Sequence, residues 1–376
     1  MSLTRRRFLR LGGAAAGAAA FARVPERSRG ACAPSRRLAL GVIGLGGMGR
    51  AHTESFLSLG DVCVRAVCDV NADKACAAQA RVNARHGRSG CAVFRDYREL
   101  CARPDIDAVV IATPDAAHAV VGLEALRCGK DVFGETPFAH TYEEGRALAA
   151  AVARYGRVWQ SGNAQRADPR FRRAVAAVRG GLIGGVARVE IGLPGGGRGP
   201  ALADAGVPDF HWRWISAWGG GTLADGIGLY GDTALWGAGR VDEPVSVDGQ
   251  GEYPRDGRYD TATAFRFNCV YRDGMTLTVA DGGRLAKGIG VRWIGRDGAW
   301  VWASNGALEA SSPDLLAAVQ ALPLEPCEGL HRDFIDCVKS RRQTLAPAEA
   351  ARLASALGQI GDKAMRGSCA SPSFFS

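Results

Sequence analysis

The chain has 376 residues, of which 47% are apolar and 23% charged, so it is long and apolar enough to bury the cores of two domains. Its net charge of +9 does not indicate a nucleic-acid-binding surface, because residues 1–37 hold nine arginines and one glutamate while the remainder carries 38 basic and 37 acidic residues. The eleven cysteines include no C-x-x-C pair and have no histidine at ligand spacing, so we expect no metal site.

The first 37 residues have the three-part layout of a twin-arginine signal followed by a linker. Three consecutive arginines at 5–7 precede an apolar stretch at 11–21, and Ala20, Phe21 and Ala22 form a small-x-small cleavage site. The apolar stretch is shorter than the roughly 20 residues that span a membrane. We therefore expect export to the periplasm or another extracytoplasmic compartment, without a stable membrane span. A disordered basic tail is the alternative.

A glycine turn follows the first predicted strand, the apolar run at 38–43. Its G-x-G-x-x-G glycines are Gly44, Gly46 and Gly49. A helical pattern at 47–59 comes next, which gives the turn the strand-then-helix context of a dinucleotide fingerprint. In that fingerprint the glycines allow the tight turn, a close approach of the backbone to a pyrophosphate, and close packing of helix on strand. Free N–H groups at the helix start, around Gly47 and Met48, then face the phosphates.

A second predicted strand, 62–68, ends at Asp69, twenty residues after Gly49. An acidic side chain at this place accepts hydrogen bonds from the adenosine ribose and repels a 2′-phosphate, so we predict NAD rather than NADP. The alternative is a glycine-rich turn in some other kind of α/β protein.

Strands and helices continue to alternate up to about residue 162, which predicts a parallel sheet in an NAD-binding Rossmann domain over 38–162. The further expected strands are 92–94, 106–112, 131–134 and 157–160, and the further expected helices are 71–85, 115–128 and 141–155. Ligands bind outside the carboxyl ends of such strands. Thr113 and Pro114 end one strand, and Glu135 and Thr136 end the next.

The pattern changes over residues 163–345, which we interpret as an α+β domain for substrate and oligomerisation. A helix at 169–179 and a strand at 186–193 precede an aromatic segment and an apolar helix at 229–236. Three Asp-Gly pairs, at 256, 273 and 297, separate alternating runs typical of antiparallel hairpins in an open sheet. Helices at 331–341 and 347–365 close the chain. Residues 346–376 are expected to pack back on the first domain and end in a loose tail.

This arrangement resembles the Gfo/Idh/MocA family, named after glucose–fructose oxidoreductase and inositol dehydrogenase, in its exported branch. Residues 41–49 are similar to the family's first strand and turn, and residues 112–118 to its fourth-strand loop. Residues 129–137 resemble G-K-x-V-x-x-E-K-P, and residues 219–232 resemble G-G-G-x-x-x-D-x-G-x-H-x-x-D. Residues 251–257 and 331–340 look like the exported branch.

The resemblance implies hydride transfer between tightly bound NAD and a hydroxyl-bearing carbon of a sugar or polyol. It implies a small-molecule partner, no nucleic acid, and a homo-oligomer formed through the open sheet. It also places residues at the cofactor beyond the glycine turn and Asp69: Thr113, Pro114, His118, Glu135 and Thr136. A structural role is the alternative for His118, which lies on an amphipathic helix.

The chain departs from the family at two catalytic positions. Thr136 stands where the family has lysine, and Leu229 stands where it has histidine. Asp232 and Asp225 remain as candidate catalytic groups. For Asp232 the alternative is a solvated or capping carboxylate. Tyr230 could replace the histidine as an acid–base group, although its ordinary pKa near 10 makes this demanding.

Arg213 and Asn163 are the candidate substrate residues. Arg213 stands among Trp212, Trp214 and Trp218, which suits an acidic sugar bound against aromatic faces. The alternative is a surface arginine stacked on one of those rings, with the tryptophans in the core or at an interface.

Three functions stay open on these residues. The first is an NAD-dependent oxidoreductase acting on a sugar or polyol hydroxyl. The second is a catalytically impaired relative that binds NAD or a sugar without turnover, which the replacements at Thr136 and Leu229 favour. The third is glycoside cleavage by transient oxidation, which also uses bound NAD.

Overall fold

The computed structural model describes residues 37–87, 89–195, 211–255 and 259–367. Three predicted features therefore lie outside the described residues: the signal up to residue 36, the Asp-Gly pair at 256, and the tail after residue 367. From residue 37 onward the chain forms one compact unit. No helix in the described part is both long and apolar enough to cross a membrane.

The first sheet is six-stranded and entirely parallel, as predicted, with the order β3-β2-β1-β4-β5-β6. Its strands are β1 (Leu38–Ile43), β2 (Val62–Cys68), β3 (Ala92–Phe94), β4 (Ala108–Ile111), β5 (Asp131–Gly134) and β6 (Trp159–Ser161). Every residue of β1, β4 and β5 is buried, because helices cover both faces of a parallel sheet. The sequence predicted β4 too long and β6 two residues early.

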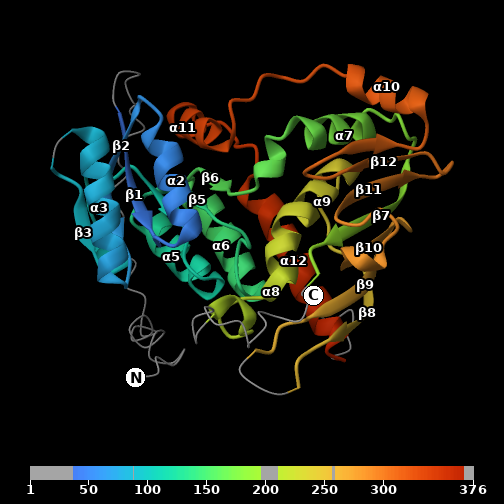
Figure 1. Cartoon of the computed structure of the whole chain (residues 1–376), viewed down its shortest axis with the longest axis horizontal. Helices are drawn as coiled ribbons and strands as arrows, with labels where there is room; N and C mark the ends of the chain where they lie inside the picture. The colour runs from blue at the N-terminus through green and yellow to red at the C-terminus, as the bar shows by residue number, and fades with distance from the viewer. Residues whose placement is uncertain (1–36, 88, 196–210, 256–258, 368–376) are drawn as a thin grey trace. The chain divides into compact units, whose positions relative to one another are not determined.

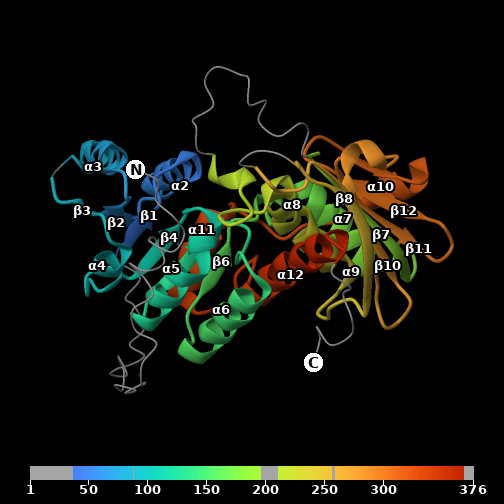
Figure 2. The ribbon, with the colours of Figure 1, turned by 90° about the horizontal axis from the view of Figure 1, so that it is seen from below.

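Helices cover both faces of this sheet (Figures 1 and 2). The first helices α2 (Gly47–Leu57) and α3 (Ala72–His86) lie on one face with the late helix α11 (Leu330–Ser340). The other face carries α4 (Tyr97–Cys101), α5 (Asp115–Arg127) and α6 (Tyr142–Tyr155). Five buried residues of α11, Phe334 among them, join the core formed by β1 and β2, so a segment near the end of the chain completes the first domain.

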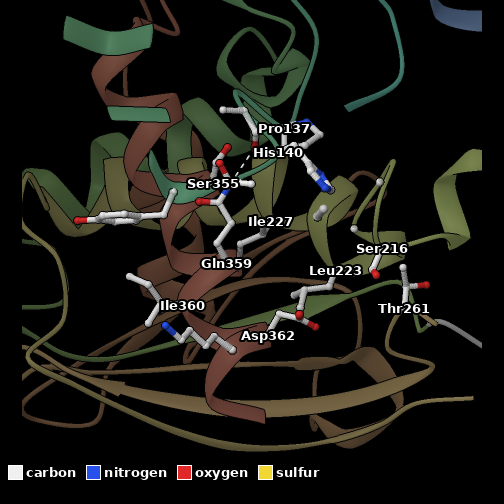
Figure 3. Close-up of a pocket in the computed structure, with 18 of the residues that line it drawn as sticks. Pro137, His140, Ser216, Leu223, Ile227, Thr261, Ser355, Gln359, Ile360 and Asp362 are labelled. Atoms are coloured by element: carbon white, nitrogen blue, oxygen red, sulfur yellow. Dashed lines mark hydrogen bonds between the residues drawn. The ribbon is translucent and has the colours of Figure 1, made fainter. Parts of the chain in front are cut away.

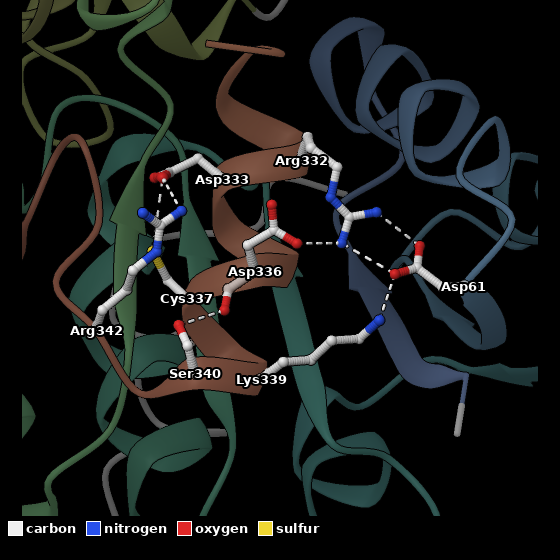
Figure 4. Close-up of polar contacts among 8 residues, drawn as sticks. All are labelled: Asp61, Arg332, Asp333, Asp336, Cys337, Lys339, Ser340 and Arg342. Carbon is white, nitrogen blue, oxygen red and sulfur yellow. Dashed lines mark hydrogen bonds and ion pairs between the residues drawn. The ribbon is translucent and has the colours of Figure 1, made fainter. Parts of the chain in front are cut away.

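Ion pairs fix α11 to the start of β2 (Figure 4). Asp61 accepts hydrogen bonds from Arg332 at 2.8 and 2.9 Å and from Lys339, and Arg332 also donates to Asp336 at 2.7 Å. The hydrogen bond from Arg332, together with Lys339, holds the pKa of the Asp61 carboxyl well below its usual range, although its partial burial opposes this shift. The position of α11 on the first domain is thus fixed by two kinds of contact: its buried apolar side chains and its ion pairs with Asp61.

The second sheet has seven strands in the order β13-β12-β11-β7-β10-β9-β8. Its strands are β7 (Val186–Leu193), β8 (Ser246–Glu252), β9 (Ala264–Val270), β10 (Thr276–Asp281), β11 (Gly290–Gly295), β12 (Trp300–Ala303) and β13 (Leu308–Ala310). The hairpins predicted at the Asp-Gly pairs 273 and 297 are present, as β9–β10 and β11–β12. The sheet is mostly antiparallel, with β7 and β10 as a parallel pair at its centre.

Helices α7 (Pro169–Arg179), α9 (Asp232–Ala238) and α12 (Ala348–Met365) cover one face of the second sheet (Figure 1). A short helix, α10 (Pro313–Ala321), packs against α7 and was not predicted from the sequence. Helix α12 also packs on α6 of the first domain and therefore joins the two sheets.

The single apolar helix predicted at 229–236 is instead part of a longer helical stretch, 221–238, that is divided into three segments. Helix α8 (Gly221–Gly226) continues into a π-helical turn, Ile227–Gly231, and then into α9. A π-helical turn inserts one extra residue into a helix and is frequent at functional sites. It rotates the side chains that follow it relative to those that precede it, so Asp225 and Asp232 have different surroundings.

Candidate active site

The glycine turn has two glycines that the fold requires and two that leave open space. Gly44 has φ +87°, and a side chain on it would lie 2.5 Å from the carbonyl oxygen of Ala112. A side chain on Gly49 would lie 1.9 Å from the carbonyl oxygen of Gly44. By contrast, nothing lies within 4 Å of a side chain built on Gly46 or Gly47. The turn is therefore tight on its inner side and open beside the N-terminus of α2, where Met48 is 52% exposed.

Asp69 is held across the same turn. Its carboxylate accepts hydrogen bonds from the backbone N–H of Leu45 at 2.7 Å and of Asn71 at 2.8 Å. Carboxylate oxygens have further lone pairs, so both can accept additional donors. Next to it Val70 is 66% exposed, an apolar surface at the carboxyl end of β2 that the sequence analysis did not single out.

His118 connects the loops that follow β4 and β5. Its Nδ1 lies 2.7 Å from the carbonyl oxygen of Pro137, and its Nε2 lies 2.9 Å from that of Thr113. Carbonyl oxygens only accept, so each ring nitrogen makes a hydrogen bond when it carries a proton. The side chain is buried. This geometry favours the structural alternative for His118: it fixes two loops at the carboxyl edge of the sheet instead of presenting itself to a ligand.

Unlike the ring nitrogens of His118, the hydroxyl of Thr113 is not used in a hydrogen bond between described residues. Its Oγ1 is buried and has no hydrogen-bond partner among the described residues. A buried hydroxyl without a partner costs free energy, so this atom is available to a ligand at the carboxyl end of β4. Pro114, beside it, precedes α5 and is half-buried.

Asp232 is almost completely enclosed by protein partners. Arg166 donates to both of its oxygens, from Nε to Oδ2 at 2.7 Å and from Nη2 to Oδ1 at 2.6 Å. Asn163 adds a third bond, from Nδ2 to Oδ2 at 2.6 Å. The Arg166 guanidinium also lies 4.5 Å from the centre of the Trp236 ring. The structure thus places two of the predicted candidates, Asn163 and Asp232, in contact. The oxygens of Asp232 are largely occupied by protein donors, which leaves little capacity to accept a substrate proton.

Asp225 is less enclosed and faces other ionisable groups. Arg213 donates to it, and about a third of each side chain is exposed. Partial burial raises the pKa of the Asp225 carboxyl above its usual range, while the Arg213 guanidinium opposes this shift. The Arg213 guanidinium also lies 4.8 Å from the centre of the Trp212 ring, as the stacked-arginine alternative expected.

Asp115, at the start of α5, is a neighbour of Asp225 that the sequence analysis did not propose. It is only 1% exposed and accepts a hydrogen bond from the backbone N–H of Gly220 at 3.3 Å. Burial raises the pKa of Asp115 to about 7, and the negative charge of Asp225 acts in the same direction. Glu135 similarly raises the pKa of Asp225. Three carboxyl groups therefore influence one another near the ends of β4 and β5.

Thr136 and Leu229, which the family resemblance places at two catalytic positions, are held by packing. A side chain on Gly228 would lie 2.7 Å from Cβ of Thr136, so Thr136 fits directly against the π-helical turn. Leu229 packs at the edge of the second core, and its carbonyl oxygen accepts from Nδ2 of Asn163 at 3.1 Å. Tyr230 is buried with its ring 6.2 Å from that of Phe171, and burial raises the pKa of its phenol. This environment disfavours Tyr230 as a proton acceptor.

A cavity of about 310 Å³ lies behind α8 (Figure 3). Pro137, Leu223, Ile227 and Gln359 are among the residues that line it. It contains no part of the glycine turn, nor Asp69, Asp225 or Asp232. Because Leu223 and Ile227 are one helical turn apart and Asp225 lies between them, Asp225 points from the opposite side of α8. The candidate site is therefore on the face of α8 that carries Asp225, near Asp115 and Glu135.

Comparison with known proteins relates the first domain of this chain to a protein family. Residues 38–163 match the family described as "Oxidoreductase family, NAD-binding Rossmann fold", which comprises Gfo/Idh/MocA proteins. These residues therefore form an NAD-binding Rossmann domain. The glycine turn and Asp69 predicted this domain, and the predicted cofactor, NAD, agrees with it.

Curated relatives match the Rossmann part of the chain. An inositol 2-dehydrogenase of Rubrobacter xylanophilus is 35% identical over 152 residues, which are 40% of this chain and 42% of that protein. A glycosyl hydrolase family 109 protein of Streptomyces filamentosus is 40% identical over 109 residues, 28% of this chain and 22% of that protein. The chain thus matches less than half the length of these relatives.

Solved structures extend the likeness to the second sheet. The WlbA dehydrogenase of Bordetella pertussis, in complex with NADH and UDP-GlcNAcA, has a TM-score of 0.70 at 19% identity and covers 88% of this chain and 97% of its own. The two-domain fold, a Rossmann domain followed by an open, mostly antiparallel sheet, is therefore shared with this dehydrogenase.

The residues present fit a nicotinamide dinucleotide. Gly46 and Gly47 leave a side-chain-free surface at the N-terminus of α2, where backbone N–H groups favour a pyrophosphate. The Asp69 carboxylate is fixed where it can accept from ribose hydroxyls, and the buried Thr113 hydroxyl lacks a partner in the described part of the chain. These residues would hold the dinucleotide along the carboxyl edge of β1, β2 and β4.

Proposed function

We propose that the protein is an NAD-dependent oxidoreductase acting on a hydroxyl group of a sugar or polyol. The observation that carries this proposal is Asp225, a partly exposed carboxylate beside the ends of β4 and β5 with a pKa raised by burial. A general base works best when its pKa lies near the working pH. The inositol 2-dehydrogenase among the relatives and WlbA among the structures support a substrate of this class.

Bound NAD supplies the acceptor for the hydride that leaves the hydroxyl-bearing carbon with two electrons. Asp225 takes the hydroxyl proton, in the role that lysine and histidine share in the family. Arg213 holds the Asp225 carboxylate by a hydrogen bond, and its charge opposes the rise in the pKa of Asp225 that burial causes. Asp232 and Arg166 do not take part in proton transfer; their ion pair holds Asn163 at the π-helical turn.

The test compares two aspartates on purified full-length protein. Released nucleotide is first assayed after denaturation, and a panel of sugars and polyols is then screened for NAD reduction. We expect Asp225→Asn to lower kcat at least about 100-fold with NAD affinity unchanged. Asp232→Asn should mainly lower stability, and Asp314→Asn on the exposed start of α10 is the matched control. A protein that carries no NAD and does not bind added NAD excludes the proposal.

A second function has an observation in its favour. Thr136 and Leu229 fill the places of two family catalytic residues by packing, as expected for a relative that binds NAD or a sugar without turnover. If the wild type binds NAD but reduces none with any substrate of the panel, the Thr136→Lys/Leu229→His variant is assayed in the same way. Turnover gained only by that variant supports the binding function.

Glycoside cleavage is distinguished by its product. The glycosyl hydrolase family 109 relatives favour it as a third function. Release of nitrophenol from nitrophenyl glycosides, dependent on NAD but without net accumulation of NADH, identifies this activity, because the cofactor is reduced and reoxidised within one cycle.

We further propose that the protein is exported in folded form with NAD bound, on the strength of the arginines at 5–7 and the apolar stretch behind them. Cell fractionation of the full chain and of an Arg5→Lys/Arg6→Lys variant tests this. Retention of the variant in the cytoplasm, with the wild type outside it, supports export; equal distribution contradicts it.

A further inference from the structure

Three ionisable side chains that the proposed chemistry does not use form a hydrogen-bonded chain. Nε2 of His52, on α2, lies 2.5 Å from Oε1 of Glu135 at the end of β5. Nδ1 of the same histidine lies 2.9 Å from Nε2 of His331 on α11. The histidines are 279 residues apart in the sequence and were not predicted to meet.

In this hydrogen-bonded chain the middle group is the most buried, and both end groups are partly exposed. His52 is 5% exposed, the Glu135 side chain is 12% exposed, and His331 is only half-buried. The ring of Phe133 stacks on that of His331 at 5.2 Å and 14°, and Phe56 packs edge-on at 4.8 Å. Two aromatic rings therefore pack against His331, one stacked and one edge-on.

The backbone around Glu135 holds this end of the hydrogen-bonded chain at the candidate site. A side chain on Gly162 would lie 2.5 Å from Oε1 of Glu135, so β6 leaves room for that carboxylate only because glycine follows it. Oε2 of Glu135 accepts from the backbone N–H of Thr136 at 3.2 Å. At the outer end, the ion pairs of Asp61 with Arg332 and Lys339 fix α11 and with it His331 (Figure 4).

Hydrogen-bond chemistry allows two arrangements of this chain that differ by one proton. When Glu135 is ionised, His52 donates from Nε2 and accepts at Nδ1 from His331. When Glu135 is protonated, it donates to Nε2 of His52, and His52 donates from Nδ1 to His331. Both histidines stay neutral in both arrangements and only change tautomer. Passing from the second to the first releases one proton at Nδ1 of His331.

We propose that Glu135, His52 and His331 form a proton path from the candidate active site to the solvent at α11, and that the proton released by the oxidation leaves along it. This inference rests on the proposed function. In this path the hydroxyl proton enters at Glu135, which ends β5 beside Thr136 at the candidate site. It leaves through the tautomer change of both histidines, while the two electrons go with the hydride to NAD. His52 and His331 are positioning residues, since they act through Glu135.

The charges around His331 agree with a neutral relay. Burial and the neighbouring His52 lower the pKa of His331 to about 4, and Glu135 opposes this only in part. The ionisable groups that face the chain are thus His52 from α2, Glu135 from the end of β5 and, through Glu135, Asp225 from α8. Arg332, the next residue of α11, is turned to Asp61.

The first measurement needs no activity: nitrogen chemical shifts of the histidines in full-length, ¹⁵N-histidine-labelled protein between pH 5 and 8. We expect the His331 ring to remain neutral over this range and its tautomer to match that of His52, with the proton on Nε2 of both rings or on Nδ1 of both. Titration of His331 to the doubly protonated form with an ordinary midpoint near 6.5 overturns the path. His86→Gln, a histidine at the end of α3, is the control for assignment.

Kinetics separates this inference from the proposed function. His331→Gln keeps a side-chain N–H for His52 but cannot change tautomer, so kcat should fall about tenfold or more with KM little changed, and added imidazole should restore part of it. An unchanged kcat, or a loss that imidazole does not relieve, overturns the path while the oxidoreductase stands. If the tautomers of the two histidines are coupled but the protein shows no turnover, the proposed oxidoreductase function is excluded instead.

Discussion

Arg166 and Asp232 form a bidentate ion pair, with N–O distances of 2.7 and 2.6 Å, in which both side chains are less than a tenth exposed. The pair joins the segment after β6 to the start of α9 and so connects the Rossmann domain with the helices of the second sheet. Its energetics follow from the cost of leaving one buried charge alone.

Arg166→Met is expected to lower the free energy of unfolding by about 3–5 kcal/mol, because Asp232 would stay buried without its cation. The double variant Arg166→Met/Asp232→Leu should recover most of this loss, since no unpaired charge remains. Urea denaturation followed by circular dichroism measures both. A loss below about 1 kcal/mol in the single variant would show that the pair contributes no more than an exposed one.

His118→Phe tests the connection between the two loops. An aromatic ring is kept, but the hydrogen bonding of the ring nitrogens to the carbonyl oxygens of Thr113 and Pro137 is lost, so we expect a loss of about 2 kcal/mol or more in stability. NAD affinity should fall about tenfold, because the loops along the cofactor are no longer fixed relative to each other. Calorimetric titration with NAD measures this. If His86→Phe weakens NAD binding equally, the effect is not specific to the loops.

Two alanine substitutions in the glycine turn should have opposite outcomes. Gly49→Ala places a methyl group 1.9 Å from a backbone oxygen, so the turn must open, and both stability and NAD binding should be lost. Gly47→Ala meets nothing within 4 Å, and its stability should stay within about 0.5 kcal/mol of the wild type. Thermal unfolding with and without NAD gives both quantities. Equal melting temperatures for the two variants would contradict the close packing at Gly49.

Asp115 predicts a dependence of stability on pH. Below about pH 4 its carboxyl is protonated in the folded and the unfolded chain alike, because the ordinary pKa is 3.8. Between pH 4 and 7 the unfolded chain loses this proton and the folded chain keeps it. Stability therefore falls by up to about 1.4 kcal/mol per pH unit, and above pH 7 this contribution is constant.

Asp115→Asn should remove that slope, since asparagine does not titrate. Urea midpoints of wild type and variant at several pH values between 4 and 8 measure the difference. If the difference between the two proteins is the same at pH 5 and pH 8, Asp115 is ionised in the folded state and the expected burial effect is absent.

The sequence predicted those parts of the fold that local patterns determine. The first two strands, the glycine turn and the hairpins at Asp273 and Asp297 depend on residues that are neighbours in the chain, and the structure confirms them. The division of the helix around Leu229 was not predicted, because an apolar run with glycines fits an α-helix and a π-helical turn equally well.

The candidate site was harder to predict because its polar groups meet over long distances in the sequence. Asp232 was recognised, but its partner Arg166 lies 66 residues earlier with no local signal. Likewise His52 and His331 have ordinary helical surroundings, and only the packing of α11 on α2 brings them together. The roles of Asp225, Asp232 and Tyr230 in catalysis stay predictions. A comparison of their surroundings favours Asp225 as the group that accepts the proton.

The place of α11 in the first core has a consequence for biosynthesis. Phe334 packs in the same apolar cluster as Val158, yet the ribosome adds it much later, about 10–40 s at ~5–20 residues per second. During that interval the nascent Rossmann domain has an uncovered apolar face. A nascent chain that ends near residue 163 should therefore bind chaperones and be sensitive to proteases, and protection should appear only when the last helices have emerged.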